Sequence, residues 1–237
     1  MSGAQAMILA AGRGERMRPL TDHCPKPMLP VRGKPLIEWH LPALAAAGLR
    51  SVVVNTAWQE DHLIAALGDG SRWGLQIHYS REGRDHGGAL ETAGGIAKAL
   101  PLLDDSFWLV SGDIHAPGFA FDPETAAEFA AADALAQLWL VPNPPFHPKG
   151  DFGIDADGFG LADGTGPDGR RWTYSNIALV KAQLCSHIAV GQKVALGPLL
   201  YAGMRKRQIR VTPFAGEWHN VGTPQQLDQL AQSKATA

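Results

Sequence analysis

The stretch A-Q-A-M-I-L-A-A-G-R-G-E-R-M-R-P-L-T, residues 4–21, decides the fold class. Its first part, Ala4–Leu9, is a short apolar run that predicts a strand, and the run leads into a loop with glycines at positions 12 and 14. Open α/β sheets bind their ligands at such loops, outside the carboxyl ends of the strands. Two glycines at one-residue spacing let backbone N–H groups curl into an anion-binding nest. The stretch therefore predicts an α/β protein with a ligand site at its first loop.

Basic residues are concentrated around this loop. Residues 10–34 hold six Lys or Arg side chains against two acidic ones, whereas the whole chain has 21 basic and 23 acidic residues and a formal charge of −2. This contrast indicates a polyphosphate ligand. A purely structural turn stays open as an alternative, because Met17 stands where the dinucleotide-binding pattern needs its third glycine, and the Walker pattern is absent.

Apolar runs and helical stretches alternate through the first half of the chain. This rhythm predicts parallel strands joined by right-handed crossovers. We expect strands at residues 51–55, 75–79 and 107–111, and helices at 36–47 (with a kink at Pro42), 59–67 and 89–100. The second half predicts helices at 123–132, 197–205 and 223–232, strands at 135–141, 172–180 and 208–213, and a small hairpin within 150–169.

The predicted architecture is a Rossmann-like three-layer α/β/α fold with a mostly parallel, mixed sheet and a small β excursion in the second half. We find no internal repeat and no linker, so residues 1–237 are expected to form one domain. The 45% of hydrophobic residues can supply a sizeable core, and with 19% charged residues they exclude a long disordered chain.

The composition also limits partners and location. A near-neutral chain lacks the broad basic face of a duplex-DNA binder, so we expect no nucleic-acid partner. Cys24 and Cys185 are the only cysteines, which indicates a reducing compartment, and we expect a cytoplasmic protein. No apolar window approaches the ~18 residues that a membrane span needs. The nine histidines do not pair at ligand spacing, which favours ordinary polar roles for them.

Four separate motifs carry a family resemblance. The first is Gly12-x-Gly14-x-Arg16-x-x-Pro19-x-Thr21 followed by P-K-P-x-x-P-V at residues 25–31. The others are L-E-T-A-G-G at 90–95, Gly112-Asp113 after a predicted strand, and W-H-N-V-G-T at 218–223. Together they resemble the sugar-phosphate nucleotidyltransferases, which join a nucleoside triphosphate to a sugar 1-phosphate and release pyrophosphate. The resemblance implies these two substrates and Mg²⁺.

The resemblance also implies roles for individual residues. Arg16 would bind the β- and γ-phosphates, Lys26 would bridge the α-phosphate and the sugar phosphate, and Asp113 would hold Mg²⁺. Asn220 stands where the family usually has a second metal-binding aspartate, so the resemblance implies a weaker metal site. The other candidates are the nucleotide-binding residues Ala10, Ala11, Gly12, Arg13, Gly14, Glu82 and Thr92, and the sugar-phosphate-binding residues Ser111, Asp151 and Asn176.

The sequence constrains the identity of the nucleotide base and of the sugar less than it constrains the type of reaction. Glu82 could accept hydrogen bonds from guanine, while backbone groups of the glycine loop could read uracil. The L-E-T-A-G-G segment and the tripeptide Gly150-Asp151-Phe152 most resemble family members that transfer UMP to N-acetylmuramate 1-phosphate in cell-wall recycling. Guanylyl transfer to mannose 1-phosphate, thymidylyl transfer to glucose 1-phosphate and a non-catalytic nucleotide-sugar-binding protein remain alternatives. We expect a monomer or a weak homo-oligomer.

Overall fold

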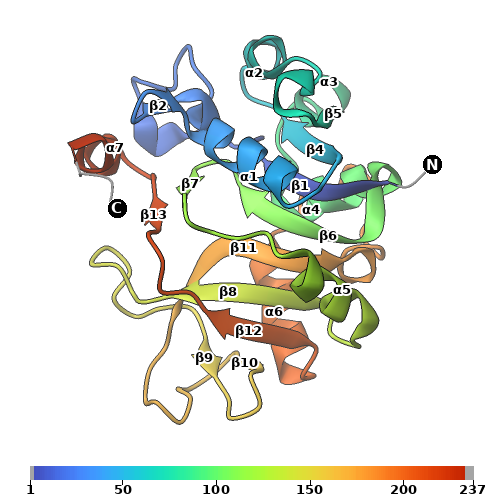
Figure 1. Cartoon of the computed structure of the whole chain (residues 1–237), viewed down its shortest axis with the longest axis vertical. Helices are drawn as coiled ribbons and strands as arrows, with labels where there is room; N and C mark the ends of the chain where they lie inside the picture. The colour runs from blue at the N-terminus through green and yellow to red at the C-terminus, as the bar shows by residue number, and fades with distance from the viewer. Residues whose placement is uncertain (1–2, 233–237) are drawn as a thin grey trace.

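A seven-stranded sheet organises the chain, in the order β12-β8-β11-β6-β1-β4-β5 (Figure 1). The computed structural model describes residues 3–232, so the ends of the expected 1–237 domain lie outside the described residues. The strands of the sheet are β1 (Ala4–Leu9), β4 (Ser51–Thr56), β5 (Gln76–Arg81), β6 (Leu103–Ser111), β8 (Ala136–Val141), β11 (Thr173–Lys181) and β12 (Ile209–Pro213).

The sheet is mostly parallel, as the alternation of strands and helices predicted. β1 lies parallel to both β4 and β6, β4 lies parallel to β5, and β8 lies parallel to β12. Only β11 runs against its two neighbours, β6 and β8. The carboxyl ends of β1, β4 and β6 therefore meet at one edge of the sheet, which is where an open α/β sheet offers a ligand site.

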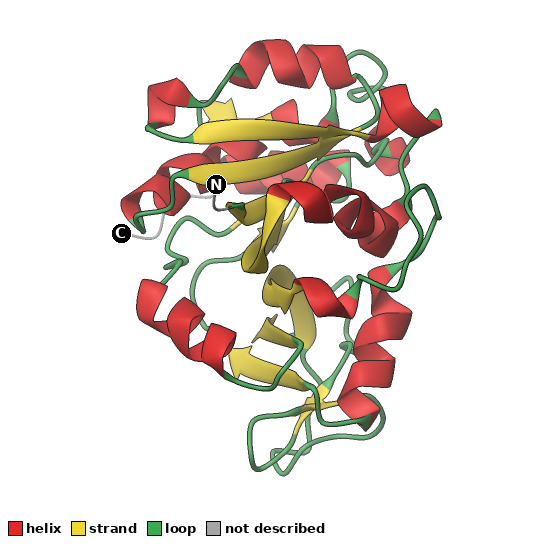
Figure 2. Cartoon of the chain, turned by 90° about the vertical axis from the view of Figure 1, so that its right-hand side faces the viewer, coloured by secondary structure: helices red, strands yellow, loops and turns green. Residues whose placement is uncertain are grey.

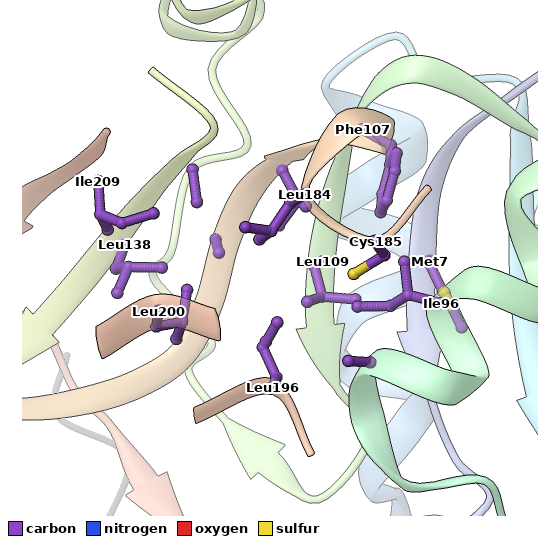
Figure 3. Close-up of a cluster of buried hydrophobic side chains, with 14 of the residues drawn as sticks. Met7, Ile96, Phe107, Leu109, Leu138, Leu184, Cys185, Leu196, Leu200 and Ile209 are labelled. Atoms are coloured by element: carbon purple, nitrogen blue, oxygen red, sulfur yellow. The ribbon is translucent and has the colours of Figure 1, made fainter. Parts of the chain in front are cut away.

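Helices cover both faces of the sheet, as Figure 2 shows. One face carries α4 (Glu91–Ala99) and α6 (Leu196–Arg205), whose Ile96 and Leu200 point into a core with Leu109 and Leu138 (Figure 3). The opposite face carries α1 (His40–Ala46), α2 (Glu60–Leu67) and α5 (Pro123–Ala131). Neighbouring residues of β1 divide between these layers: Met7 lies in the first core and Ile8 in the second. The three-layer α/β/α prediction is thus confirmed.

A third, smaller core joins the two ends of the described chain. The last helix, α7 (Pro224–Gln232), contributes Leu227 and Leu230, which pack with Met17 and Val31 from the region of the first loop. The short strands β2 (Pro30–Val31) and β3 (Lys34–Pro35) pair there as a hairpin. This packing places the W-H-N-V-G-T motif, residues 218–223, close to the glycine loop.

Several boundaries differ from the sequence prediction. The helix expected at 36–47 is a 3-10 turn over Leu36–Trp39 followed by α1, so Pro42 lies in the first turn of an α-helix, where a missing N–H costs nothing. The segment after β5, expected as a loop, begins with the short helix α3 (Glu82–His86). The predicted hairpin is present as β9 (Gly153–Ile154) and β10 (Gly160–Leu161).

Two strands of two residues each have long-range consequences. β7 (Ile114–His115) pairs with β13 (His219–Asn220), which joins segments more than 100 positions apart.

Within residues 3–232, no helix is long and apolar enough to cross a lipid bilayer.

Candidate active site

The glycine loop leaves β1 and turns through a 3-10 helix at Glu15–Met17. Gly14 begins this turn with φ +67°, in the left-handed region, and its carbonyl accepts a hydrogen bond of 2.8 Å from the Thr21 hydroxyl. A Cβ at position 14 would lie 3.1 Å from Lys26 Cβ, so the loop and the lysine segment are in close contact. Glycine suits this position for both its backbone conformation and its small size.

Lys26 and Asp113 meet at the centre of the site. Lys26 begins a 3-10 turn at Lys26–Met28, held between Pro25 and Pro27, and its Nζ lies 2.5 Å from Asp113 Oδ2. Asp113 follows β6 directly, where the Gly112 N–H donates to the Leu9 carbonyl at 2.9 Å. The lysine side chain is only 11% exposed, so it is a partly buried, positioned charge.

The backbone at Asp113, the residue before β7, lies next to β13. Asn220 stands opposite Ile114 in the β13–β7 pair, and the Val221 N–H donates to the Asp113 carbonyl at 3.1 Å. The described residues contain no cluster of three or more His, Cys, Asp or Glu side chains that could hold a metal. A carboxylate and an amide oxygen are nevertheless hard donors of the type that Mg²⁺ takes in proteins, together with water and substrate phosphates.

Two arginines of the loop are held in different ways. The Arg13 guanidinium lies 4.4 Å from the ring centre of Trp58, whose indole N–H donates to the Thr21 carbonyl at 2.8 Å. Trp58 therefore supports a cation beside the site. Arg16 lies against Gly222, where an added Cβ would be 3.4 Å from the guanidinium. Neither arginine forms an ion pair with any described residue, so both charges are available to phosphates.

A cavity of about 530 Å³ lies between these groups. It brings together eleven of the predicted site residues, from Ala10–Gly14, Arg16 and Lys26 to Glu82, Thr92, Ser111 and Asp113. Sequence reasoning missed Asn55, Ala89, Glu91 and Gly222, which also line it. The signal for Asn55 was present, because it is a polar residue at the carboxyl end of an apolar strand.

Glu82 has a different structural setting from the one the sequence suggested. It is fully buried, and its two carboxylate oxygens accept hydrogen bonds of 2.7 Å each from Asn55 Nδ2 and from the Leu90 N–H. Asn55 Oδ1 in turn accepts from the Ala10 N–H at 2.7 Å. Burial raises the pKa of Glu82, while these hydrogen bonds oppose the rise. Because both oxygens already have protein partners, the hypothesis that Glu82 reads a guanine edge loses its support.

The start of α4 forms another wall of the cavity. Glu91 has φ +62°, a conformation that L-residues adopt at a cost and that recurs at functional sites. Thr92 follows it in the first turn and lines the cavity. Gly95, one turn later, lies against the buried network: a Cβ there would be 2.6 Å from Glu82 Oε1. The glycine therefore makes room for the carboxylate.

A second cavity of about 540 Å³ adjoins the first. The two share Leu9, Arg16, Thr92 and Ser111 among their lining residues. The second also contains the predicted residues Asp151, Asn176 and Asn220. Sequence reasoning favoured an ordinary polar role for His147, which also lines this cavity. It missed the remaining walls, which include Phe146, Thr173, Tyr174, Tyr201 and the first turn of α6.

Asn176 has a left-handed backbone conformation. Its φ is +61°, within a register shift of β11 between Tyr174 and Ala178. Asparagine tolerates this left-handed conformation better than most residues do. The position is thus constrained by its backbone, and the side chain faces the second cavity.

Ion pairs and a hydrogen bond among polar side chains stabilise the β7–β13 pair. Arg32 forms an ion pair with Glu217 at 2.9 Å, and His219 Nε2 lies 3.3 Å from the same carboxylate. Arg32 also contacts His115 Nε2 at 3.2 Å. Burial and the nearby Arg32 lower the pKa of His115 to about 4. These contacts hold the segments that carry Asp113 and Asn220 in place.

Cationic backbone nests at this edge of an α/β sheet are characteristic of proteins that handle nucleoside polyphosphates. This chain belongs to the nucleotidyl transferase family, whose model matches residues 5–158. The resemblance to the sugar-phosphate nucleotidyltransferases is therefore confirmed.

Individual relatives support this assignment. The N-acetylmuramate alpha-1-phosphate uridylyltransferase of Neisseria meningitidis serogroup B is 44% identical over 98% of this chain and 99% of that protein. A Caulobacter vibrioides protein of the same name is 37% identical over 65% of each chain. A solved structure from Bacillus anthracis, provisionally assigned as a glucose-1-phosphate thymidylyltransferase, has a TM-score of 0.79, 17% identity, and covers 96% of this chain and 93% of that one. That likeness supports the fold alone.

Proposed function

We propose that this protein transfers UMP from UTP to N-acetylmuramate 1-phosphate, giving the nucleotide sugar and pyrophosphate. The observation that carries the proposal is the pair of adjoining cavities that share Arg16, Thr92 and Ser111. The first has the glycine nest and the cations that a triphosphate requires, and the second has the volume and polar walls for a sugar. The names of the Neisseria and Caulobacter relatives supply the base and the sugar.

The chemistry asks mainly for charge neutralisation and alignment. An oxygen of the sugar phosphate attacks the α-phosphorus of UTP, and the bond to the pyrophosphate oxygen breaks in line with it. The second pKa of a phosphate monoester is ~6, so the nucleophile is already ionised near neutral pH and needs no general base. What opposes the reaction is the repulsion between two polyanions, which positioned cations relieve.

The residues of this chain divide that task. In this proposal the N–H groups of Ala11–Gly14 and the Arg13 and Arg16 guanidiniums hold the β- and γ-phosphates. Lys26, which lines the first cavity, neutralises the α-phosphate and the incoming sugar phosphate. Ser111, Asp151 and Asn176 position the sugar. Ala10 and Thr92 lie against the nucleoside, while Glu82 holds the backbone around it.

Asp113 and Asn220 would hold Mg²⁺. When bound, the ion supplies Lewis-acid polarisation of the α-phosphate and screens its charge. An amide oxygen supplies a dipole and no formal charge, so this pair should hold the ion less tightly than two carboxylates.

The proposal extends to domain organisation, oligomeric state and location. We propose a single nucleotidyltransferase domain that acts as a monomer or weak homo-oligomer. The free thiols Cys24 and Cys185 fit a reducing compartment, so we propose the cytoplasm as its location.

Pyrophosphate release tests the proposal. Four nucleoside triphosphates are assayed against N-acetylmuramate, N-acetylglucosamine, mannose and glucose 1-phosphates, with the Lys26→Ala protein as a blank. We expect the highest kcat/KM for UTP with N-acetylmuramate 1-phosphate. Preference for GTP with mannose 1-phosphate, or dTTP with glucose 1-phosphate, would reassign the substrates. Tight nucleotide-sugar binding without turnover of any pair would show a non-catalytic protein.

A further inference from the structure

The second cavity offers few charges to a substrate. Among its described lining residues, only Arg16 and His147 can carry a positive charge, and only Asp151 is acidic. Arg16 also lines the phosphate cavity and lies against Gly222. His147 is therefore the one cationic group that belongs to the second cavity alone.

His147 is carried by a loop of fixed shape, residues 142–150. Asn143 ties the loop together: its Nδ2 donates to the carbonyls of Pro148 at 3.1 Å and Arg171 at 3.0 Å. Its Oδ1 accepts from the Thr173 hydroxyl at 2.9 Å. The His147 N–H donates to the Pro144 carbonyl at 2.9 Å. The loop consequently presents its side chains in a defined position before any ligand binds.

Asp151 orients the His147 ring. The ring Nε2 lies 3.0 Å from Asp151 Oδ1, and Asp151 Oδ2 accepts from the Tyr174 N–H at 2.8 Å. The aspartate thus fixes the tautomer with a proton on Nε2. Nδ1 has no hydrogen-bond partner in the described chain, and once protonated it becomes a donor for an anion.

An acidic sugar needs such a group. Muramic acid differs from glucosamine by a lactyl ether on O3, which carries a carboxylate. Building on the proposed function, we propose that His147, oriented by Asp151, is the specificity-determining residue that pairs with this carboxylate. Phe146, 54% exposed beside it, gives the loop an apolar face for the carbon atoms of the substituent.

The test compares two sugar phosphates that differ only in the lactyl group. Initial rates with UTP are measured for N-acetylmuramate and N-acetylglucosamine 1-phosphates, using an inhibition constant where turnover is too slow. The proteins are the unaltered chain, His147→Gln, His147→Lys and the control His187→Gln, whose exposed histidine lies outside both cavities. A hydrogen bond to a charged group is worth ~1.5–3 kcal/mol, or about 10- to 100-fold.

We expect His147→Gln to lower the preference for the muramate substrate at least tenfold, and His147→Lys to restore part of it. His187→Gln should keep the preference of the unaltered chain. An equal loss with both sugars, or no change in preference, would overturn the role of His147. No turnover of N-acetylmuramate 1-phosphate by the unaltered chain would instead overturn the proposed function, and the inference would fall with it.

Discussion

Lys26 Nζ lies 2.5 Å from Asp113 Oδ2, although 87 positions separate the two residues. The cation proposed to act on phosphate and the carboxylate proposed to bind Mg²⁺ therefore form an ion pair. Both are partly shielded from water, with 11% and 28% of the side chains exposed. In the proposed mechanism, substrate binding replaces this ion pair with a contact between Lys26 and phosphate and one between Asp113 and Mg²⁺. The ion pair holds the two side chains at the same place in the site.

Lys26→Ala should lose most turnover while the fold remains. Removing one positioned donor to transition-state charge typically costs ~3–4 kcal/mol, or 10²–10³ in rate. Steady-state kcat and circular dichroism check the two parts of this prediction. Lys193→Ala, at an exposed lysine outside both cavities, serves as the control. A Lys26→Ala rate within threefold of the unaltered protein would rule out the proposed role.

Asp113→Ala should abolish the Mg²⁺-dependent reaction and weaken Mg²⁺ binding in the presence of a non-hydrolysable UTP analogue. A carboxylate is the strongest hard ligand at this strand end. Calorimetry measures binding independently of turnover. Unchanged metal dependence would mean that Asp151 or another acid is the ligand.

Asn220→Asp should lower the Mg²⁺ concentration that gives half the maximal rate. Two carboxylates attract a divalent cation more strongly than one carboxylate and one amide. Mg²⁺ titrations at saturating UTP and sugar phosphate compare the two proteins. Superimposable curves would remove Asn220 from the metal site and leave it a role in the β13 turn.

Glu82→Gln should raise the KM for UTP about tenfold with a smaller effect on kcat. Its amide must turn an N–H₂ toward either Asn55 Nδ2 or the Leu90 N–H, and an unmatched buried donor costs ~1–3 kcal/mol. The chain of hydrogen bonds that links the Ala10 N–H to the Leu90 N–H then loses one member.

The double variant Asn55→Asp with Glu82→Gln provides the matched control. Its carboxylate and amide exchange places, so every hydrogen bond from the Ala10 N–H to the Leu90 N–H can form again with the same net charge. We expect its KM for UTP to return toward that of the unaltered protein. If Glu82→Gln lowered thermal stability and left this KM unchanged, the network would be structural only.

Gly95→Ala should destabilise the protein, although alanine is normally better in a helix by ~1 kcal/mol. The added Cβ would meet Glu82 Oε1 at 2.6 Å and Asn55 Nδ2 at 2.9 Å. Gly197→Ala in α6, where nothing lies within 4 Å of the new atom, should be neutral or stabilising. Urea unfolding of both variants checks the difference in sign, and equal effects would contradict the close contact.

The sequence by itself determined the layers and the chemical type of the site. Apolar runs such as Ser51–Asn55 have no polar alternation because both faces of the strand are covered, so the pattern records burial directly. The glycine spacing and the local cations likewise express backbone freedom and charge, which are properties of a single short segment. All fourteen residues proposed from the sequence line one of the two cavities, although other lining residues were missed.

Only the tertiary structure decided which distant groups share hydrogen bonds. Glu82 and Asn55 were each visible as polar residues near strand ends. Only the β4–β5 register and the start of α4 show that each oxygen of the buried carboxylate accepts a hydrogen bond within the protein. The sequence placed His147 near a predicted site loop but favoured an ordinary polar role for it, and only the structure shows it beside Asp151 and the second cavity. A residue's neighbours across tens of positions depend on how whole elements pack together, and local sequence carries no record of that.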